Sequence, residues 1–326
     1  MKPLGEPLTQ TILAATKASA ITHQEVLQSL WSGYGQIVRL TLADAIPSTV
    51  IIKHVQTKPH HSHPRGWNSD HSHQRKLRSY HIETSWYQNW NTHCSAQCRT
   101  PNLLDSSVHE GELLLILEDL DSSGYPQRLT HLTPSQVESG LAWLAHFHAT
   151  FLGQSPSELW EVGTYWHLAT RPDELAALTD QALQAAAPAI DQKLSSARYQ
   201  TFVHGDAKLA NFCFSPDGKK VAALDFQYVG GGCGMKDVAY FLGSCLDEAT
   251  CEVQESELLD TYFHHLTKAL AEHQPMIQPS AIITEWRELY PYAWADFHRF
   301  LKGWSPGHWK LNSYSEKMVQ QVLTEL

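Results

Sequence analysis

Hydrophobic and polar positions change their spacing along the chain, and each change marks a different kind of element. Residues 48–55, STVIIKHV, alternate and are rich in β-branched side chains, which is typical of a half-buried strand. Residues 112–120, ELLLILEDL, are apolar until they end in acidic positions, which predicts a fully buried strand. From about Leu132 most segments have helical spacing. The pattern predicts a helix and strands in the N-terminal part, a short connection near 118–124, and a larger helical part.

The segment after the first of these strands has no apolar period. KPHHSHPRGWNSDHSHQ (58–74) is rich in His, Ser, Pro, Gly and Asn, which predicts a loop. Its histidines are candidate ligands for a transition metal: His60, His61, His63, His71 and His73. Because nothing in such a segment fixes the geometry of a metal site, we favour a solvated loop.

A helix is predicted from Arg75 onward. Four of its residues fall on one face by helical spacing: Ser79, Ile82, Trp86 and Trp90. Glu83 lies beside this face.

Composition narrows the class of protein. A chain of 326 residues exceeds the usual size of one compact core, so two lobes are expected, and 42% hydrophobic residues are enough to fill them. The 24 basic and 34 acidic side chains leave a net charge of -10, which argues against nucleic acid as the main partner. No stretch approaches the roughly 20 apolar residues that span a bilayer, and Met1 to Gly5 do not resemble a secretion signal. We therefore expect a cytoplasmic protein without a membrane partner.

Six cysteines fit that compartment, because none forms a CxxC pair. Cys94 and Cys98 lie one helical turn apart next to His93, a spacing that could hold a metal ion. Four good ligands are not apparent, so free thiols are the preferred interpretation.

The most informative stretch is HGDAKLANFCFSPDGKKVAALDFQ (204–227). Two apolar arms flank SPDGKK, in which Pro and Asp-Gly favour a turn, so the stretch predicts a hairpin. Folding it back brings Asn211 near Asp225, and their oxygen atoms suit Mg²⁺. Asp206, five positions before Asn211, is close enough to receive a proton from an attacking hydroxyl. This set of groups is what phosphoryl transfer needs.

Each of these residues also has a plainer interpretation. Asp206 and Asn211 could stabilise turns, and Asp225 could cap a helix. The functional interpretation requires the Asp-to-Asn spacing, the hairpin length and the terminal aspartate to coincide, and they do. We therefore favour a kinase.

The pattern HGDxxxxN followed by DF resembles that of the aminoglycoside phosphotransferase and choline kinase superfamily of small-molecule kinases. Within it, HGDAKLANF, LDFQ and KDVAYFL are most similar to the ecdysteroid-kinase-like group. The resemblance implies an α+β, protein-kinase-like fold of two lobes. Residues 1–120 would form a nucleotide-binding lobe with an antiparallel sheet and a helix. Residues 121–326 would form a larger, mainly helical lobe for catalysis and acceptor binding.

The resemblance also implies roles for single residues. Asp206 would be the catalytic base, Asn211 and Asp225 the Mg²⁺ ligands, and Lys208 a cation that stabilises charge on the transferring phosphoryl group. The cofactors would be ATP and Mg²⁺, and the partner a small molecule with a hydroxyl acceptor. Asp237 begins a helical run and is expected to cap it and steady the catalytic loop.

Two further interpretations compete with this one. The chain could be a nucleotide-binding regulatory protein of the same fold without turnover, although it keeps all the expected catalytic residues. It could be a protein kinase, but Gln227 replaces the usual glycine and the following VGGGCGMKD is too short for a peptide-positioning segment. The sequence names neither the acceptor nor the oligomeric state.

The N-terminal part contains candidates for the nucleotide-binding groups. Lys53 ends the apolar run VIIK and would pair with Glu83, as such kinases do to hold the α- and β-phosphates; a snorkelling lysine and a rim glutamate are the alternative. Gly33 and Gly35 permit a tight turn over phosphates, although an ordinary hairpin also explains them. The adenine edge is placed at Glu118 to Leu120.

Aromatic residues are concentrated in WRELYPYAWADFHRFLKGWSPGHWK (286–310). Those with helical spacing are expected to lie mostly in the core, although aromatic walls could also hold an acceptor. Asp296 and His298 lie off that face and are candidate acceptor contacts.

Overall fold

The computed structural model describes residues 5–30, 33–56, 70–109 and 111–326. The chain divides into two compact units. The first comprises Met1–Thr92 and Thr100–Pro126, and the second His93–Arg99 and Gln127–Leu326. The division near residue 126 lies a few residues beyond the one expected at 120, and the segment His93–Arg99 belongs to the second unit.

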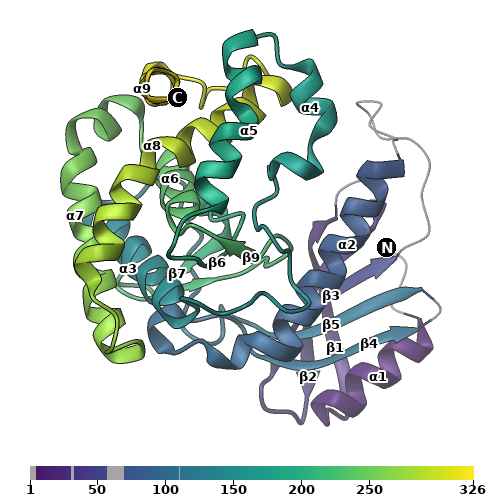
Figure 1. Ribbon diagram of the computed structural model, residues 1–326. Helices are drawn as coiled ribbons and strands as arrows, with labels where there is room; N and C mark the ends of the chain where they lie inside the picture. Colours follow the sequence, from purple (N-terminus) through teal and green to yellow (C-terminus); the bar gives the residue numbers. More distant parts are fainter. Residues whose placement is uncertain (1–4, 31–32, 57–69, 110) are drawn as a thin grey trace. The chain divides into compact units, whose positions relative to one another are not determined.

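The first unit contains a five-stranded antiparallel sheet with strand order β1-β2-β3-β5-β4 (Figure 1). The two strands expected at 48–55 and 112–120 are β3 and β5, and they pair with each other. The helices and strands of this unit are α1 (Glu6–Thr16), β1 (Ala20–Ser29), β2 (Gly35–Ala43), β3 (Thr49–Gln56), α2 (Asp70–Ser85), β4 (Leu103–His109) and β5 (Glu112–Glu118).

Alternation along the strands gives the sheet two different faces. One face packs against α1 and buries an aliphatic core: Ile12, Val38, Leu40, Leu42, Val50, Ile52, Leu114 and Ile116. Lys53 is the next residue after Ile52, so its side chain points to the opposite face, toward Glu83 of α2. The strand pattern thereby directs a buried ammonium away from the aliphatic core.

Helix α2 begins earlier than expected. It starts at Asp70 rather than at Arg75, so the loop predicted through residue 74 is wrong over its last five positions. The imidazole of His73 stacks on Tyr34, with ring centroids 5.7 Å apart, and bonds the tyrosine hydroxyl through Nδ1. This packing supports a first turn whose sequence has no apolar period. His60, His61 and His63 lie outside the described residues.

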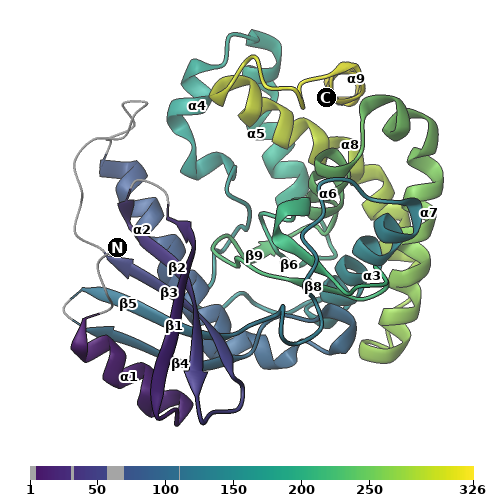
Figure 2. The same cartoon turned by 180° about the vertical axis from the view of Figure 1, so that it is seen from behind.

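The second unit is mainly helical and has two small two-stranded sheets (Figures 1 and 2). Helix α3 packs along α7, and α8 packs against α5, α6 and α9. The helices and strands are α3 (Pro134–Thr150), α4 (Pro172–Ala177), α5 (Gln181–Ser195), β6 (Thr201–Val203), β7 (Phe212–Phe214), β8 (Val221–Ala223), β9 (Gly230–Gly232), α6 (Met235–Cys245), α7 (Glu248–His273), α8 (Pro279–Trp304) and α9 (Ser313–Glu325).

Four of the helices begin where a side chain caps the first turn. Thr133 and Gln136 form a capping box at α3, and Asp180, Asp247 and Asn312 cap α5, α7 and α9. Residues on the aromatic face of α8 are at most 5% exposed, as expected for a core: Trp286, Tyr290, Ala293, Trp294, Phe297 and Phe300. None of the helices in the described parts of the chain is long and apolar enough to cross a membrane.

Candidate active site

The predicted hairpin forms and determines where the candidate site lies. Strands β7 and β8 pair from Phe212↔Ala223 to Phe214↔Val221 around a turn that contains Asp217 and Gly218. At the open end of the hairpin, the Leu224 amide donates to the Asn211 carbonyl oxygen over 3.0 Å. This bond continues the ladder by one pair and places the backbone of Asp225 next to Asn211.

Asp206 is held by its own loop. Its Oδ2 accepts hydrogen bonds from Lys208 Nζ at 2.9 Å and Asn211 Nδ2 at 3.1 Å. Asn211 Nδ2 also donates to the Asp206 carbonyl oxygen at 2.8 Å. The residue is only 6% exposed, and its Oδ1 has no close hydrogen bond among the described residues, although the Tyr240 hydroxyl lies near enough to the carboxylate to interact with it. A buried carboxylate oxygen without a partner is costly and often marks a functional site.

Asp225 and Lys208 complete this group of charges. Asp225 has a left-handed backbone (φ 69°), and its Oδ1 accepts from Gln227 Nε2 at 2.7 Å. Burial opposes the charge on Lys208, but the carboxylates of Asp206 and Asp225 outweigh burial and raise the pKa of the lysine. Both carboxylates therefore stabilise the protonated form of Lys208, and this lysine is charged at neutral pH.

Asp237, at the start of α6, fixes the catalytic loop. Its Oδ2 accepts from the His204 amide at 2.5 Å and its Oδ1 from the Gly205 amide at 3.0 Å. His148 Nε2 on α3 contacts the same carboxylate at 3.2 Å. The carboxylate is fully buried and does not cap α6 with a side-chain bond. Asp237 was expected both to cap the helix and to steady the catalytic loop. In the structure its side chain contacts the loop and does not cap the helix.

Gly205 is required by close backbone approach. Its φ is +79°, and a Cβ atom at this position would lie 2.1 Å from the Tyr228 carbonyl oxygen. Thr164 N would be only 2.8 Å away. Both neighbours are backbone atoms, so neither can give way cheaply.

Gly205→Ala should therefore disrupt the catalytic loop. The positive φ alone costs on the order of 1–3 kcal/mol in a residue with a side chain, and the overlap adds to it. Gly153→Ala is the matched control, because Gly153 has φ +76° with open space around its Cβ position. Urea denaturation should show a clearly larger loss of stability for the Gly205 variant. Equal losses in the two variants would contradict the steric argument.

Sequence reasoning missed three residues near Asp206. The hydroxyl groups of Tyr165 and Tyr240 lie 3.1 Å apart. Burial holds the pKa of both tyrosines above the ordinary value, and the negative charge of Asp206 adds to the increase. Tyr240 lies within KDVAYFL, which is part of the family resemblance, and Lys310 ends WSPGHWK, the last part of the aromatic stretch. Nothing in either segment indicates that these residues lie near Asp206.

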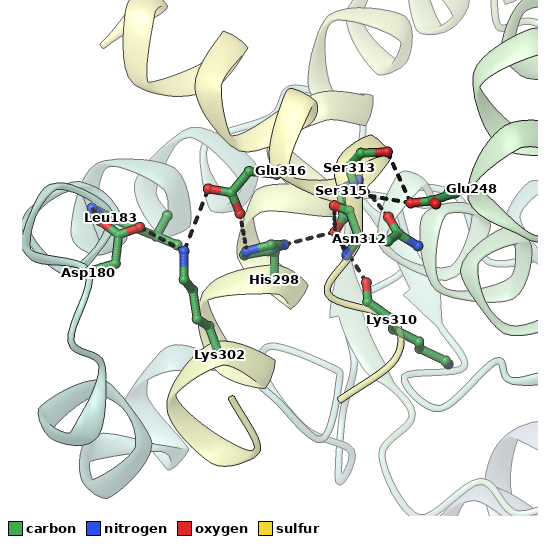
Figure 3. A network of polar contacts seen from close by, with 10 residues as sticks. All are labelled: Asp180, Leu183, Glu248, His298, Lys302, Lys310, Asn312, Ser313, Ser315 and Glu316. Carbon is green, nitrogen blue, oxygen red and sulfur yellow. Dashed lines mark hydrogen bonds and ion pairs between the residues drawn. The ribbon is translucent and has the colours of Figure 1, made fainter. Parts of the chain in front are cut away.

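Lys310 is surrounded by aromatic rings. Its Nζ lies 4.5 Å from the ring centroid of Tyr240, 5.7 Å from that of Phe297 and 5.5 Å from that of Trp309. Burial lowers the pKa of the lysine to about 8, while Asp206 partly offsets this. Figure 3 shows the Lys310 side chain pointing away from the polar network of α8 and α9, to which the residue contributes its carbonyl oxygen.

Asp296 is a structural residue rather than an acceptor contact. It is fully buried and accepts hydrogen bonds from Trp166 Nε1 at 3.0 Å and Arg299 Nη2 at 2.6 Å, and Lys236 Nζ lies 3.3 Å away. Both cations lower the pKa of the carboxyl group against the opposing effect of burial. The expectation that Asp296 touches an acceptor is therefore wrong.

His298 is also part of a structural network (Figure 3). Its Nδ1 contacts Ser315 Oγ at 3.0 Å and its Nε2 contacts Glu316 at 3.1 Å. Burial lowers the pKa of the imidazole to about 4, so the ring is neutral at pH 7. The ring holds α8 against α9 and is 2% exposed, which leaves it no surface for an acceptor.

In the first unit, the predicted pair of Lys53 and Glu83 forms. Lys53 Nζ lies 2.6 Å from Glu83 Oε2, and the two side chains are 5% and 2% exposed. Such a buried pair is costly to desolvate, so the pair alone is weak evidence of a stabilising role. Its action on nucleotide phosphates stays a prediction.

The other nucleotide-binding candidates lie in the same unit. Gly33 and Gly35 have φ of 75° and 137°, and a Cβ on Gly35 would lie 2.0 Å from the His54 carbonyl oxygen, so the hairpin itself requires glycine there. The Glu118 amide donates to Asn102, whereas the Leu120 amide donates to no group among the described residues. The roles of Gly33, Gly35, Glu118 and Leu120 in nucleotide binding stay predictions.

None of the six cysteines forms a disulfide bond. Cys98 is buried, and its Sγ lies 3.8 Å from Thr150 Oγ1. Hydrogen bonds from Cys94, Ser95 and Thr150 lower its pKa to about 7 in spite of burial.

Comparison with solved structures shows the fold of the whole chain. A choline kinase from Cryptosporidium parvum has a TM-score of 0.53 at 11% identity and covers 98% of this chain and 94% of its own. An ethanolamine kinase from Plasmodium vivax has a TM-score of 0.52 at 10% identity, with 99% and 95% covered. A microcompartment-associated aminopropanol kinase has a TM-score of 0.52 at 12% identity, with 98% and 94% covered.

Sequence comparison covers a shorter segment. No curated protein matches the chain in sequence. A sequence model of the ecdysteroid kinase-like family matches residues 158–274, the part that contains the catalytic loop, the hairpin and α6. These findings support the superfamily resemblance that the motifs indicated. The segment that carries the candidate site thus matches the ecdysteroid kinase-like family, and the chain as a whole has the fold of the small-molecule kinases.

Proposed function

We propose that this protein is an ATP- and Mg²⁺-dependent phosphotransferase that transfers the γ-phosphate to a hydroxyl group of a small molecule. The observation that carries the proposal is that the two oxygen atoms of the Asp206 carboxylate have different surroundings. Lys208 and Asn211 bond one of its oxygens, whereas the other is buried without a close hydrogen bond to a described residue, and the Tyr240 hydroxyl lies near the carboxylate. A hydroxyl donor from an acceptor would satisfy that second oxygen.

Asp206 would act as the base in this reaction. As the acceptor oxygen bonds to the γ-phosphorus, the bond from that phosphorus to the bridging oxygen of the β-phosphate would break and ADP would leave. The proton of the acceptor hydroxyl would pass to Asp206, while the bonds to Oδ2 hold the carboxylate in position. Lys208 is the cation closest to this carboxylate, and its raised pKa keeps it charged through the reaction. It would stabilise negative charge on the transferring group.

The residues at the hairpin end fit a magnesium ion. Asn211 uses Nδ2 on Asp206, so its Oδ1 is the atom left for a cation, and Asp225 supplies a carboxylate. Mg²⁺ prefers such hard oxygen ligands, one or two from the protein, with phosphate and water completing the shell. When bound, the ion would neutralise phosphate charge. Lys53, fixed by Glu83, would contribute a further positive charge to the nucleotide.

We further propose that the acceptor is neutral or anionic. A ring of aromatic faces near a carboxylate would suit a cationic acceptor, but here Lys310 already occupies the aromatic faces of Tyr240, Phe297 and Trp309. A cationic amino alcohol would meet its repulsion. The comparison structures are named for choline, ethanolamine and aminopropanol, so this chain would differ from them in the charge of its substrate.

Lys310→Met should open the aromatic site to a quaternary ammonium ion. A desolvated cation–π contact is worth about 2 kcal/mol, so choline should bind the variant at least about tenfold more tightly than the parent protein. The parent protein should bind choline most weakly, relative to the variant, below about pH 8, where Lys310 is protonated. The difference between the two proteins should shrink above this pH, where the lysine loses its charge. Isothermal titration with choline at pH 7 and pH 9 measures both effects.

Lys317→Met is the control for that experiment, because Lys317 is 55% exposed and pairs with Glu252 on the surface. It should leave choline binding unchanged. Equally weak binding of choline by the Lys310 variant and the parent at both pH values would refute the assignment of acceptor charge.

The test of the proposed function is ADP release from MgATP in the presence of a panel of neutral, anionic and cationic hydroxyl compounds. At least one neutral or anionic member should stimulate release, and EDTA should abolish it. The alternative, a regulatory protein that binds nucleotide without turnover, predicts stabilisation by MgATP with no release above background for any member of the panel.

A further inference from the structure

We propose that His146, Glu272 and His273 form a binding site for a transition-metal ion of the Zn²⁺ type. His146 lies on α3, and Glu272 and His273 form the end of α7, all within the second unit. One ligand atom from each of the three lies within 4.8 Å of the others. None of these residues has a part in the proposed phosphoryl transfer.

Two ring nitrogens point to a ligand that the protein does not supply itself. His146 Nδ1 and His273 Nε2 are buried and have no hydrogen-bond partner among the described residues. The His146 side chain as a whole is only 9% exposed. A buried polar atom without a partner is costly, and both histidines have one such atom in the same cluster. A metal ion bound to the two nitrogens would satisfy both at once.

The two histidines of the cluster lie close together. Their imidazole rings are perpendicular, with centroids 6.2 Å apart. A third histidine, His265 of α7, is not part of the cluster and is engaged by Glu138 instead, with 3.1 Å between His265 Nε2 and Glu138 Oε1.

The ligand atoms of the three side chains determine which metal ions would bind. Two imidazole nitrogens and one carboxylate oxygen suit Zn²⁺ and its neighbours, whereas Mg²⁺ prefers oxygen donors alone. Zn–N distances of about 2.0–2.1 Å would require the ligand atoms to approach to about 3.3 Å of one another. Glu272 is exposed and His273 half-buried, so both can rotate toward the buried His146. Water would complete a tetrahedral shell.

Such an ion would join the end of α7 to the C-terminal part of α3. The two helices already pack along each other, and Gln274 Nε2 donates to the Leu152 carbonyl oxygen beyond the cluster at 3.3 Å. The metal would add a link at the position where α7 ends and its last carbonyl groups lack helical partners.

The test is Zn²⁺ and Co²⁺ binding to the full-length protein, measured by equilibrium dialysis and by the visible absorption of tetrahedral Co²⁺. Because His60, His61 and His63 are also candidate metal ligands, the reference protein carries alanine at these three positions. It should bind about one equivalent of Zn²⁺. His146→Ala, His273→Ala and Glu272→Gln, each made in the reference protein, should weaken this binding by more than about a hundredfold.

His264→Ala is the matched control, since His264 is an exposed histidine of α7 outside the cluster. It should bind Zn²⁺ as the reference does. Glu272→Gln and His273→Ala change residues at the surface and the helix end, so they decide the question even where His146→Ala impairs folding. Absence of stoichiometric binding in the reference, or equal affinity in the cluster variants and in His264→Ala, would overturn the proposal. No nucleotide is used, so the outcome is independent of the phosphotransferase function.

Discussion

Asp206→Asn should lower phosphoryl transfer by about 10²–10⁴-fold while nucleotide binding changes little. The amide keeps the shape of the side chain but cannot accept the proton of the acceptor hydroxyl. The bonds from Lys208 and Asn211 to Oδ2 would lose their charge assistance, so the loop should loosen slightly but remain in place. ADP release under saturating MgATP measures turnover, and titration with a fluorescent ATP analogue measures binding.

Asp217→Asn is the control for this experiment. Asp217 is an exposed aspartate in the turn of the same hairpin, where its Oδ1 accepts from Ser215 Oγ at 2.6 Å. Its variant should keep turnover within a few-fold of the parent. Turnover of the Asp206 variant within about twofold of the parent would exclude Asp206 as the base.

Lys53→Met should both destabilise the protein and remove activity. The change leaves Glu83 as a buried carboxylate, which is 2% exposed, without the ammonium that lies 2.6 Å from it. Breaking one side of a buried ion pair costs about 3–5 kcal/mol. Guanidinium denaturation should show this loss as a lower midpoint with an unchanged slope.

The double variant Lys53→Met/Glu83→Leu separates structure from function. Two apolar side chains of similar volume remove the uncompensated charge, so most of the lost stability should return. Turnover should not return, because the phosphates would still lack the Lys53 cation. Recovery of activity together with stability would mean that the pair is only structural.

Local features of the sequence were sufficient to predict the hairpin and much of the fold. The 204–227 stretch contains its own turn and both arms, so Asn211 and the backbone of Asp225 come together through contacts close in sequence. The β3 and β5 strands were readable because alternation and apolar runs map directly onto pleated strands.

The residues that could not be predicted depend on contacts between distant segments. Tyr165, Tyr240 and Lys310 lie on three separate parts of the chain, and no local pattern brings them to Asp206. Asp296 was misread because the polar positions of a helix normally face solvent. From Leu289 to Leu301 every residue of α8 is buried, so its polar side chains lie inside the protein and bond one another.

The seven residues His93–Arg99 affect how chimeras with related kinases should be designed. The carbonyl oxygen of Arg99 accepts hydrogen bonds from Trp143 Nε1 at 2.9 Å and from the Ala223 amide at 3.0 Å, so this segment supports the hairpin that carries Asp225. A hybrid joined once at residue 126 would replace residues 93–99 with those of the related kinase, so the hairpin would lose its native contacts with Arg99. A hybrid that keeps the native 93–99 segment, with two additional junctions, would preserve it, so the N-terminal part is not exchangeable as a single continuous cassette.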